Sequence, residues 1–82
     1  MEFNEYMQYR IDASVKNGVT HLPEILNKFM VDNGTEAGLE SLLQDAQRQE
    51  QEAESFSMNH LFYWSLTTHL KDIILHWKLM QE

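Results

Sequence analysis

HLFYWSLTTHLKDIILHWKLM, residues 60–80, is the segment in which the aromatic and large aliphatic side chains of this sequence are most concentrated. It contains both tryptophans and three of the four histidines of a chain of 82 residues. When these residues are wound at about 100° each, large apolar side chains gather on one broad face, which is typical of a helix that packs on a core. The residues of this first face are Phe62, Leu66, Leu70, Ile73, Trp77 and Met80, flanked by Tyr63 and Ile74.

A second apolar stripe of the same helix does not fit that face. Its members are Leu61, Trp64, Leu75 and Leu79, with Thr68 between them. On one side, a narrow polar strip divides the two apolar surfaces and consists of His60, Thr67, Lys71 and Lys78. A helix that is apolar on nearly two sides either lies at the centre of its bundle or buries its second side against another chain. The sequence leaves both interpretations open.

Upstream of this stretch, the spacing of apolar residues predicts shorter helices. The first helix, about residues 2–16, carries an apolar residue at every fourth position, namely Phe3, Met7, Ile11 and Val15, with Tyr6 and Ser14 beside this stripe. Asn17-Gly18 is expected to end it in the left-handed conformation, and Thr20 is expected to open the next helix. Pro23 fits the first turn of that second helix, where its missing N–H costs nothing.

The remaining boundaries follow from capping residues. Asn33-Gly34 stops the second helix, and Thr35 is a good N-cap for the third. Ser55 or Ser57 is an N-cap for a separate fourth helix, although one long continuous helix is the alternative. We therefore predict one all-α domain over residues 1–82, a small bundle of three to four helices in which the last is central and longest. The expected helices span about 2–16, 22–33, 36–54 and 58–80.

The size and composition of the chain limit what it can do. A chain this short buries only about 60–65% of the surface that its unfolded form exposes, so its core is modest. It has no cysteine, which excludes disulfides and thiolate zinc sites as a source of stability and leaves self-association. The N-terminus shows no secretory signal and no run of about 18 apolar residues occurs, so we expect a cytoplasmic protein without a membrane span.

The chain is acidic, and its acidic residues are concentrated in one segment. Its net charge of −7 argues against direct binding to nucleic acid or anionic lipid. Residues 36–54 hold six acidic residues against a single base, Arg48. These acids form either a solvated helix face or an imitation of a phosphate track, as in phage or mobile-element counter-defence proteins that inhibit a nucleic-acid-binding protein. They are Glu36, Glu40, Asp45, Glu50, Glu52 and Glu54.

Metal binding and catalysis find little support in the sequence. His69, Asp72 and His76 fall on one side of the last helix, and these residue types can ligate zinc. The two histidines lie ~10.5 Å apart along the helix axis, so one ion would strain all three side chains. An Asp72–His76 pair at the edge of the helix is the simpler interpretation. His21 and His60 are the only other histidine candidates, and no catalytic motif is present, so we expect no cofactor and no enzymatic activity.

The function expected from the sequence is therefore recognition of another protein. Tryptophan and leucine at the centre of a desolvated patch are typical of interface hot spots. We expect a small acidic regulator, acting as a homodimer or other homo-oligomer, whose protein partner the sequence does not identify. The predicted contact residues are Leu61, Trp64, Leu75 and Leu79, with Tyr63 and Lys71 at the rim.

Overall fold

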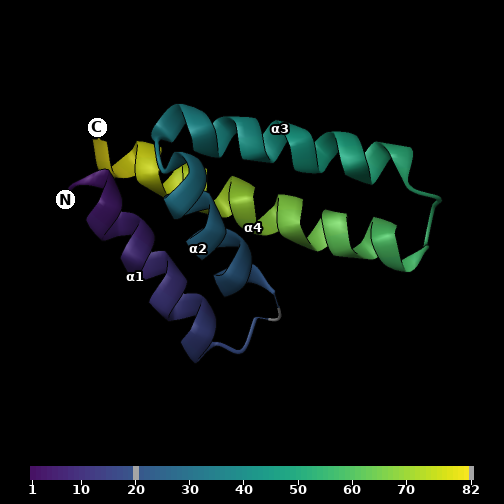
Figure 1. The fold of residues 1–82 in the computed structure, drawn as a ribbon, viewed down its shortest axis with the longest axis horizontal. Helices are drawn as coiled ribbons and strands as arrows, with labels where there is room; N and C mark the ends of the chain where they lie inside the picture. The colour runs from purple at the N-terminus through teal and green to yellow at the C-terminus, as the bar shows by residue number, and fades with distance from the viewer. Residues whose placement is uncertain (20, 82) are drawn as a thin grey trace. The chain divides into compact units, whose positions relative to one another are not determined.

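The computed structural model describes residues 1–19 and 21–81, and these residues form four helices and no strand (Figure 1). The helices are α1 (Phe3–Lys16), α2 (Leu22–Asn33), α3 (Glu36–Glu52) and α4 (Met58–Gln81). The predicted all-α bundle is confirmed, and α4 is the longest helix with 24 residues. The expected central place of α4 stays a prediction, and Thr20, expected to open α2, lies outside the described residues.

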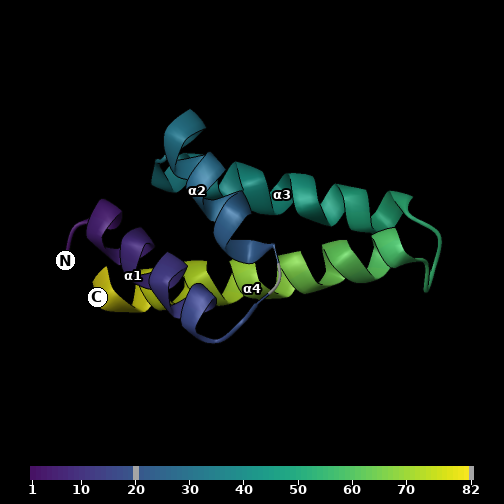
Figure 2. The ribbon, with the colours of Figure 1, turned by 60° about the horizontal axis from the view of Figure 1, so that its bottom comes forward.

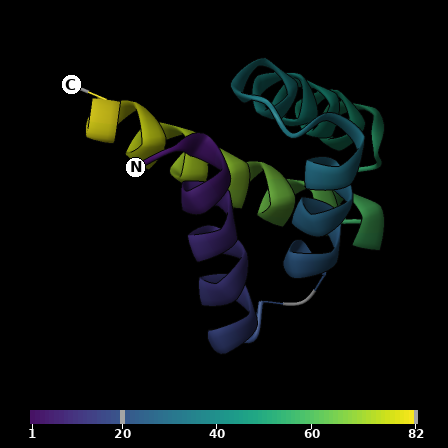
Figure 3. The ribbon, with the colours of Figure 1, turned by 60° about the vertical axis from the view of Figure 1, so that its left-hand side comes forward.

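The chain divides into two compact units, residues 1–38 and 39–82. The predicted single domain over residues 1–82 stays a prediction beside this division. In the first unit, α1 and α2 contact each other and run in opposite directions (Figure 3). The buried residues of these two helices are Tyr6, Met7, Ile11, Ser14, Leu22, Leu26 and Phe29.

The expected stripe of α1 was wrong at its end. Val15 is 62% exposed, whereas Tyr6 and Ser14, expected beside the stripe, are buried. The buried face continues from Ile11 to Ser14, three residues on, and Val15 lies about 100° further around the helix. Burial of the Ser14 hydroxyl is possible because it donates a hydrogen bond of 2.8 Å to the Ile11 carbonyl oxygen.

Two glycines end the first two helices in different ways. Gly18 has a φ of 69°, the expected left-handed conformation after α1. Gly34 has a φ of −76° and so needs no such freedom. It is instead a site of close approach, because a Cβ there would lie 2.8 Å from the Met30 carbonyl oxygen.

The corner between α2 and α3 is held by a side-chain cap. The backbone N–H of Gly38 donates to Thr35 Oγ1 at 2.9 Å, which confirms Thr35 as the N-cap of α3. A Cβ at Gly38 would lie only 2.3 Å from the Asn33 carbonyl oxygen. A side chain at position 38 would therefore force the corner open.

The second unit is an antiparallel hairpin of α3 and α4, which pack closely (Figures 1 and 2). Its buried apolar residues are Leu39, Ala46, Leu66, Leu70, Ile73, Ile74 and Trp77. An ion pair of 3.1 Å between Lys78 Nζ and Glu40 Oε1 joins the two helices. None of the helices in the described part of the chain is long and apolar enough to cross a membrane.

The break between α3 and α4 rules out one continuous helix. α3 ends at Glu52, two residues before the predicted end, and Ser57 caps α4 by accepting a hydrogen bond of 3.1 Å from the His60 backbone N–H. Phe56 has a φ of 66°, a left-handed conformation that reverses the chain and that a non-glycine residue adopts at a cost of about 1–2 kcal/mol. Of the two serines considered as caps, Ser57 is the one the structure uses.

Candidate functional site

The first face of α4 is buried along its middle and exposed at its ends. Leu66, Leu70, Ile73 and Trp77 are buried as predicted, together with the flanking Ile74. Phe62 and Met80, at the two ends, are 37% and 48% exposed, which corrects the prediction. When the helix is viewed down its axis, Phe62 and Met80 lie at the edge of the first face, where fewer neighbouring residues cover a side chain. The Phe62 ring makes an edge-to-face contact with Tyr63, with ring centroids 5.0 Å apart.

The predicted polar strip also needs one correction. Thr67 is 4% exposed and so belongs to the buried surface of α4, whereas Lys71 and Lys78 are exposed. Its Oγ1 is buried without a hydrogen-bond partner among the described residues. The methyl group of Thr67 adds apolar surface to the buried face, whereas the unpaired hydroxyl costs about 1–3 kcal/mol.

The second stripe of α4 is exposed along its whole length. Leu61, Trp64, Leu75 and Leu79 are 47%, 55%, 56% and 54% exposed, respectively. The rim residue Tyr63 is half-buried, and Lys71 is exposed. We call the surface formed by Leu61, Trp64, Thr68, Leu75 and Leu79 the α4 face. Their exposure favours neither of the two interpretations that the sequence leaves open, and both stay predictions.

The residues of the α4 face lie close to one line along the helix. Leu61, Thr68 and Leu75 follow one another at intervals of seven residues, close to two helical turns, so they lie nearly in line. The Thr68 hydroxyl donates a hydrogen bond of 2.9 Å to the Trp64 carbonyl oxygen. This bond uses the only hydroxyl donor of the face, which makes the centre of the face easier to desolvate.

Opposite charges border the α4 face. Lys71 and Asp72 are three and four residues from Thr68, so they lie on opposite sides of the line through Thr68 and Leu75. Asp72 pairs with His76 at 3.4 Å, as predicted, and its side chain remains 47% exposed. Lys71 has no ion-pair partner among the described residues, whereas Lys78 is engaged with Glu40.

The acidic surface of α3 and the residues that follow it is exposed but partly neutralised. Five of the six predicted carboxylates are exposed and Glu50 is half-buried. Asp45 accepts a hydrogen bond from Arg48, and this bond together with the Asp45 charge raises the pKa of the Arg48 guanidinium. Glu40 pairs with Lys78. Two of the six carboxylates therefore already hold a cation of the same chain.

The structure brings together only two of the three residues considered as metal ligands. Asp72 and His76 are paired, and His69 is half-buried on the same helix. Within residues 1–19 and 21–81, no group of three or more histidine, aspartate or glutamate side chains is arranged to hold a metal ion. The pair is adequately explained as an i, i+4 contact on the helix surface.

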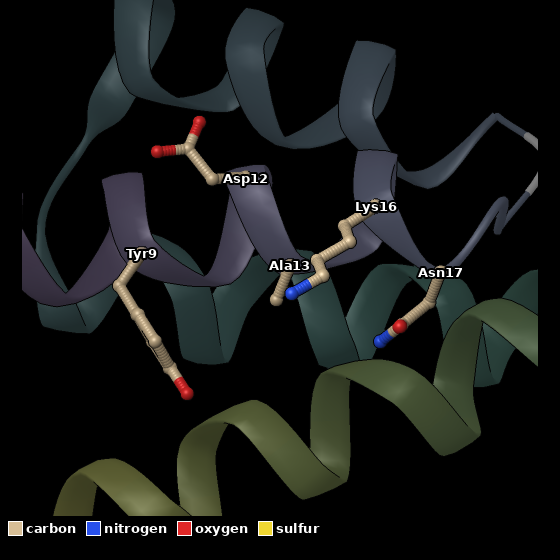
Figure 4. Close-up of a pocket in the computed structure, with 5 residues that line it drawn as sticks. All are labelled: Tyr9, Asp12, Ala13, Lys16 and Asn17. Atoms are coloured by element: carbon tan, nitrogen blue, oxygen red, sulfur yellow. The ribbon is translucent and has the colours of Figure 1, made fainter.

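A hollow along α1 was not foreseen from the sequence. It has a volume of about 360 Å³, and its described lining residues are Tyr9, Asp12, Ala13, Lys16 and Asn17 (Figure 4). Figure 4 shows Tyr9 and Asn17 pointing to one side of the helix, while the Asp12 carboxylate points the other way. Asp12 also accepts a hydrogen bond from Gln8. Because the polar groups do not converge on one point, this hollow offers no defined ligand chemistry.

Comparison with known proteins found no relative of this chain. No family model matches the chain. No curated protein and no solved structure is significantly similar to it. The two surfaces from which a function can be inferred are therefore the α4 face and the acidic surface of α3.

Proposed function

We propose that this chain is a non-catalytic regulatory module that acts by binding protein through the α4 face, and that it works as a homo-oligomer. The observation that carries the proposal is the exposure of four large apolar side chains on one side of one helix. Large exposed apolar patches are rare on monomeric proteins and mark interaction sites, and the four side chains on one side of α4 are candidates for such a patch. Tyr63 and Lys71 form the rim of the surface in this proposal.

The energetic reason is the cost of leaving these side chains in water. Burying a whole leucine or aromatic side chain contributes ~1.5–3 kcal/mol. Leu61, Trp64, Leu75 and Leu79 each leave about half of that burial unused, which is on the order of 1 kcal/mol per residue. Covering all four would gain about 4 kcal/mol from this chain, and a second copy would bring the total to about 8 kcal/mol, which lies within the range of ~4–15 kcal/mol that association costs.

Trp64→Glu tests the proposal. Trp64 is 55% exposed, so a glutamate at this position is tolerated by the isolated chain but introduces a charge into the proposed interface. Static light scattering at one fixed concentration should give an oligomer for the wild type and a mass near 9.7 kDa for the variant. A matched control is Val31→Glu, because Val31 is an exposed apolar residue on α2, outside the α4 face. A wild-type chain that is already monomeric would contradict the proposed homo-oligomer.

A second function is favoured by the exposed carboxylates of α3. In this alternative the acidic surface occupies the basic groove of a nucleic-acid-binding protein and inhibits it. Glu36, Glu52 and Glu54 are exposed. The cytoplasmic location expected from the sequence forms part of both proposals.

Charge reversal tests this alternative. Replacing Glu50, Glu52 and Glu54 together by lysine should abolish a salt-sensitive complex captured from the lysate of the native host, while the helical circular dichroism signal stays unchanged. A captured complex that survives the triple replacement would eliminate nucleic-acid mimicry. The Trp64→Glu variant is the control here, since it leaves the acidic surface intact.

A further inference from the structure

We infer that the α4 face is occupied by a second copy of this chain, with the two α4 helices parallel and Lys71 of each copy facing Asp72 of the other. This inference rests on the proposed function and adds the identity and orientation of the partner. It is carried by the position of the charges beside the apolar stripe. Lys71 lies on one side of the stripe, and Asp72 lies on the other.

In a symmetric dimer, these charges favour the parallel orientation of the two α4 helices. Two copies related by a two-fold axis along parallel helices bring the left side of one stripe against the right side of the other. Lys71 then meets Asp72 of the second copy at both edges of the interface. The same arrangement stacks Trp64 on Trp64 and Leu75 on Leu75, so the apolar residues match along the whole face.

An antiparallel pair gives the opposite result. Its two-fold axis is perpendicular to the helices, so each side of the stripe meets the same side of the second copy. The stripe runs from Leu61 to Leu79, and its midpoint falls next to Lys71 and Asp72. In full overlap the two Lys71 side chains would therefore meet each other, as would the two Asp72 carboxylates. Like charges directly opposite each other disfavour this orientation.

The two charged groups are exposed at the edges of the α4 face. Lys71 is exposed, and no ion pair holds it among the described residues. Asp72 keeps about half of its side chain in solvent beside His76, and a carboxylate has room for more than one donor. Lys78, the other lysine on that side, already pairs with Glu40 and adds little charge of its own.

Paired charge reversals test the contact. Lys71→Glu gives a chain with two acids at the edges, and Asp72→Lys gives a chain with two lysines there. In native mass spectrometry, with one variant labelled with nitrogen-15, each variant alone should dimerise roughly tenfold more weakly than the wild type. An equimolar mixture of the two variants should form heterodimers almost exclusively, since both edges then pair opposite charges, one with the original sign and one with the sign reversed.

The other outcomes separate the two proposals. Variants that dimerise as strongly as the wild type and mix statistically overturn the Lys71–Asp72 contact but leave the proposed function standing. A preference of Lys71→Glu for the wild-type chain as its partner indicates the antiparallel pair and also overturns the inference. A wild type that is monomeric at every concentration overturns both the proposed function and the inference.

Cysteine cross-linking reads the orientation independently of charge. The chain has no cysteine, so a single introduced thiol can form a disulfide only with a second copy. Leu61→Cys treated with diamide should form the disulfide dimer if the helices are parallel. In an antiparallel pair the two introduced thiols would lie ~27 Å apart along the axis, and only a mixture of Leu61→Cys with Leu79→Cys would cross-link. Cross-linking of that mixture without cross-linking of Leu61→Cys alone would overturn the inference.

Discussion

Two leucines of α4 should respond very differently to the same substitution. Leu70 is 0% exposed and belongs to the first face, whereas Leu75 is 56% exposed and belongs to the α4 face. Leu70→Ala removes a fully buried side chain and leaves a cavity, which costs about 3–5 kcal/mol. In the isolated chain, Leu75→Ala removes a side chain that is mostly in water and should cost less than about 1 kcal/mol.

Urea denaturation followed by circular dichroism at 222 nm measures both effects. A domain of this size is stable by only about 4–12 kcal/mol, so Leu70→Ala should lower the urea midpoint severely or unfold the chain. At a protein concentration of about 1 μM, Leu75→Ala should unfold close to the wild type. At about 100 μM the wild type should be stabilised by self-association, and Leu75→Ala should lose that concentration dependence.

Two outcomes would contradict the predicted difference between Leu70 and Leu75. If Leu75→Ala destabilises the dilute chain as much as Leu70→Ala does, then Leu75 is buried within the monomer. The central-helix interpretation of the sequence would then be correct, and the α4 face would not be a docking surface. A wild type whose urea midpoint does not change with concentration would also count against self-association.

Two further predictions concern the helix ends. Gly38→Ala should destabilise the chain by about 1–3 kcal/mol, because the new Cβ would lie 2.3 Å from the Asn33 carbonyl oxygen. This clash should outweigh the better helix propensity of alanine. Urea denaturation at low protein concentration measures the free energy of unfolding, and a stabilised variant would contradict the prediction. Ser57→Ala should lower the free energy of unfolding by about 1 kcal/mol, because the hydrogen bond from the His60 N–H is lost. Ser55→Ala should be nearly neutral in the same assay. Equal effects of the two variants would show that Ser57 is not the cap.

The helix boundaries were predictable because the residues that set them act locally. Thr35 and Ser57 each accept a hydrogen bond from a backbone N–H three residues ahead, and Gly18 adopts the left-handed conformation that closes α1. Such signals depend on a few consecutive residues and survive in almost any tertiary context. The choice between a broken and a continuous helix around Phe56 was harder, because its left-handed φ has no sequence signature outside glycine and asparagine.

Burial was less predictable, because periodicity gives the faces of a helix but not what covers them. The pattern at Val15 and the pattern at Leu70 look equally apolar in sequence, yet only Leu70 is buried. Thr67 was assigned to a polar strip from its hydroxyl, although its methyl group made burial possible. The existence of the second stripe was visible in the sequence, whereas its exposure required the structure.

Sedimentation equilibrium of the wild-type chain over concentrations from about 1 to 300 μM decides whether the α4 face is an interface. The exposed face predicts a mass that rises with concentration from 9.7 kDa toward twice that value, and a Trp64→Glu variant that stays at 9.7 kDa throughout. A wild-type mass of 9.7 kDa at every concentration would contradict self-association through α4.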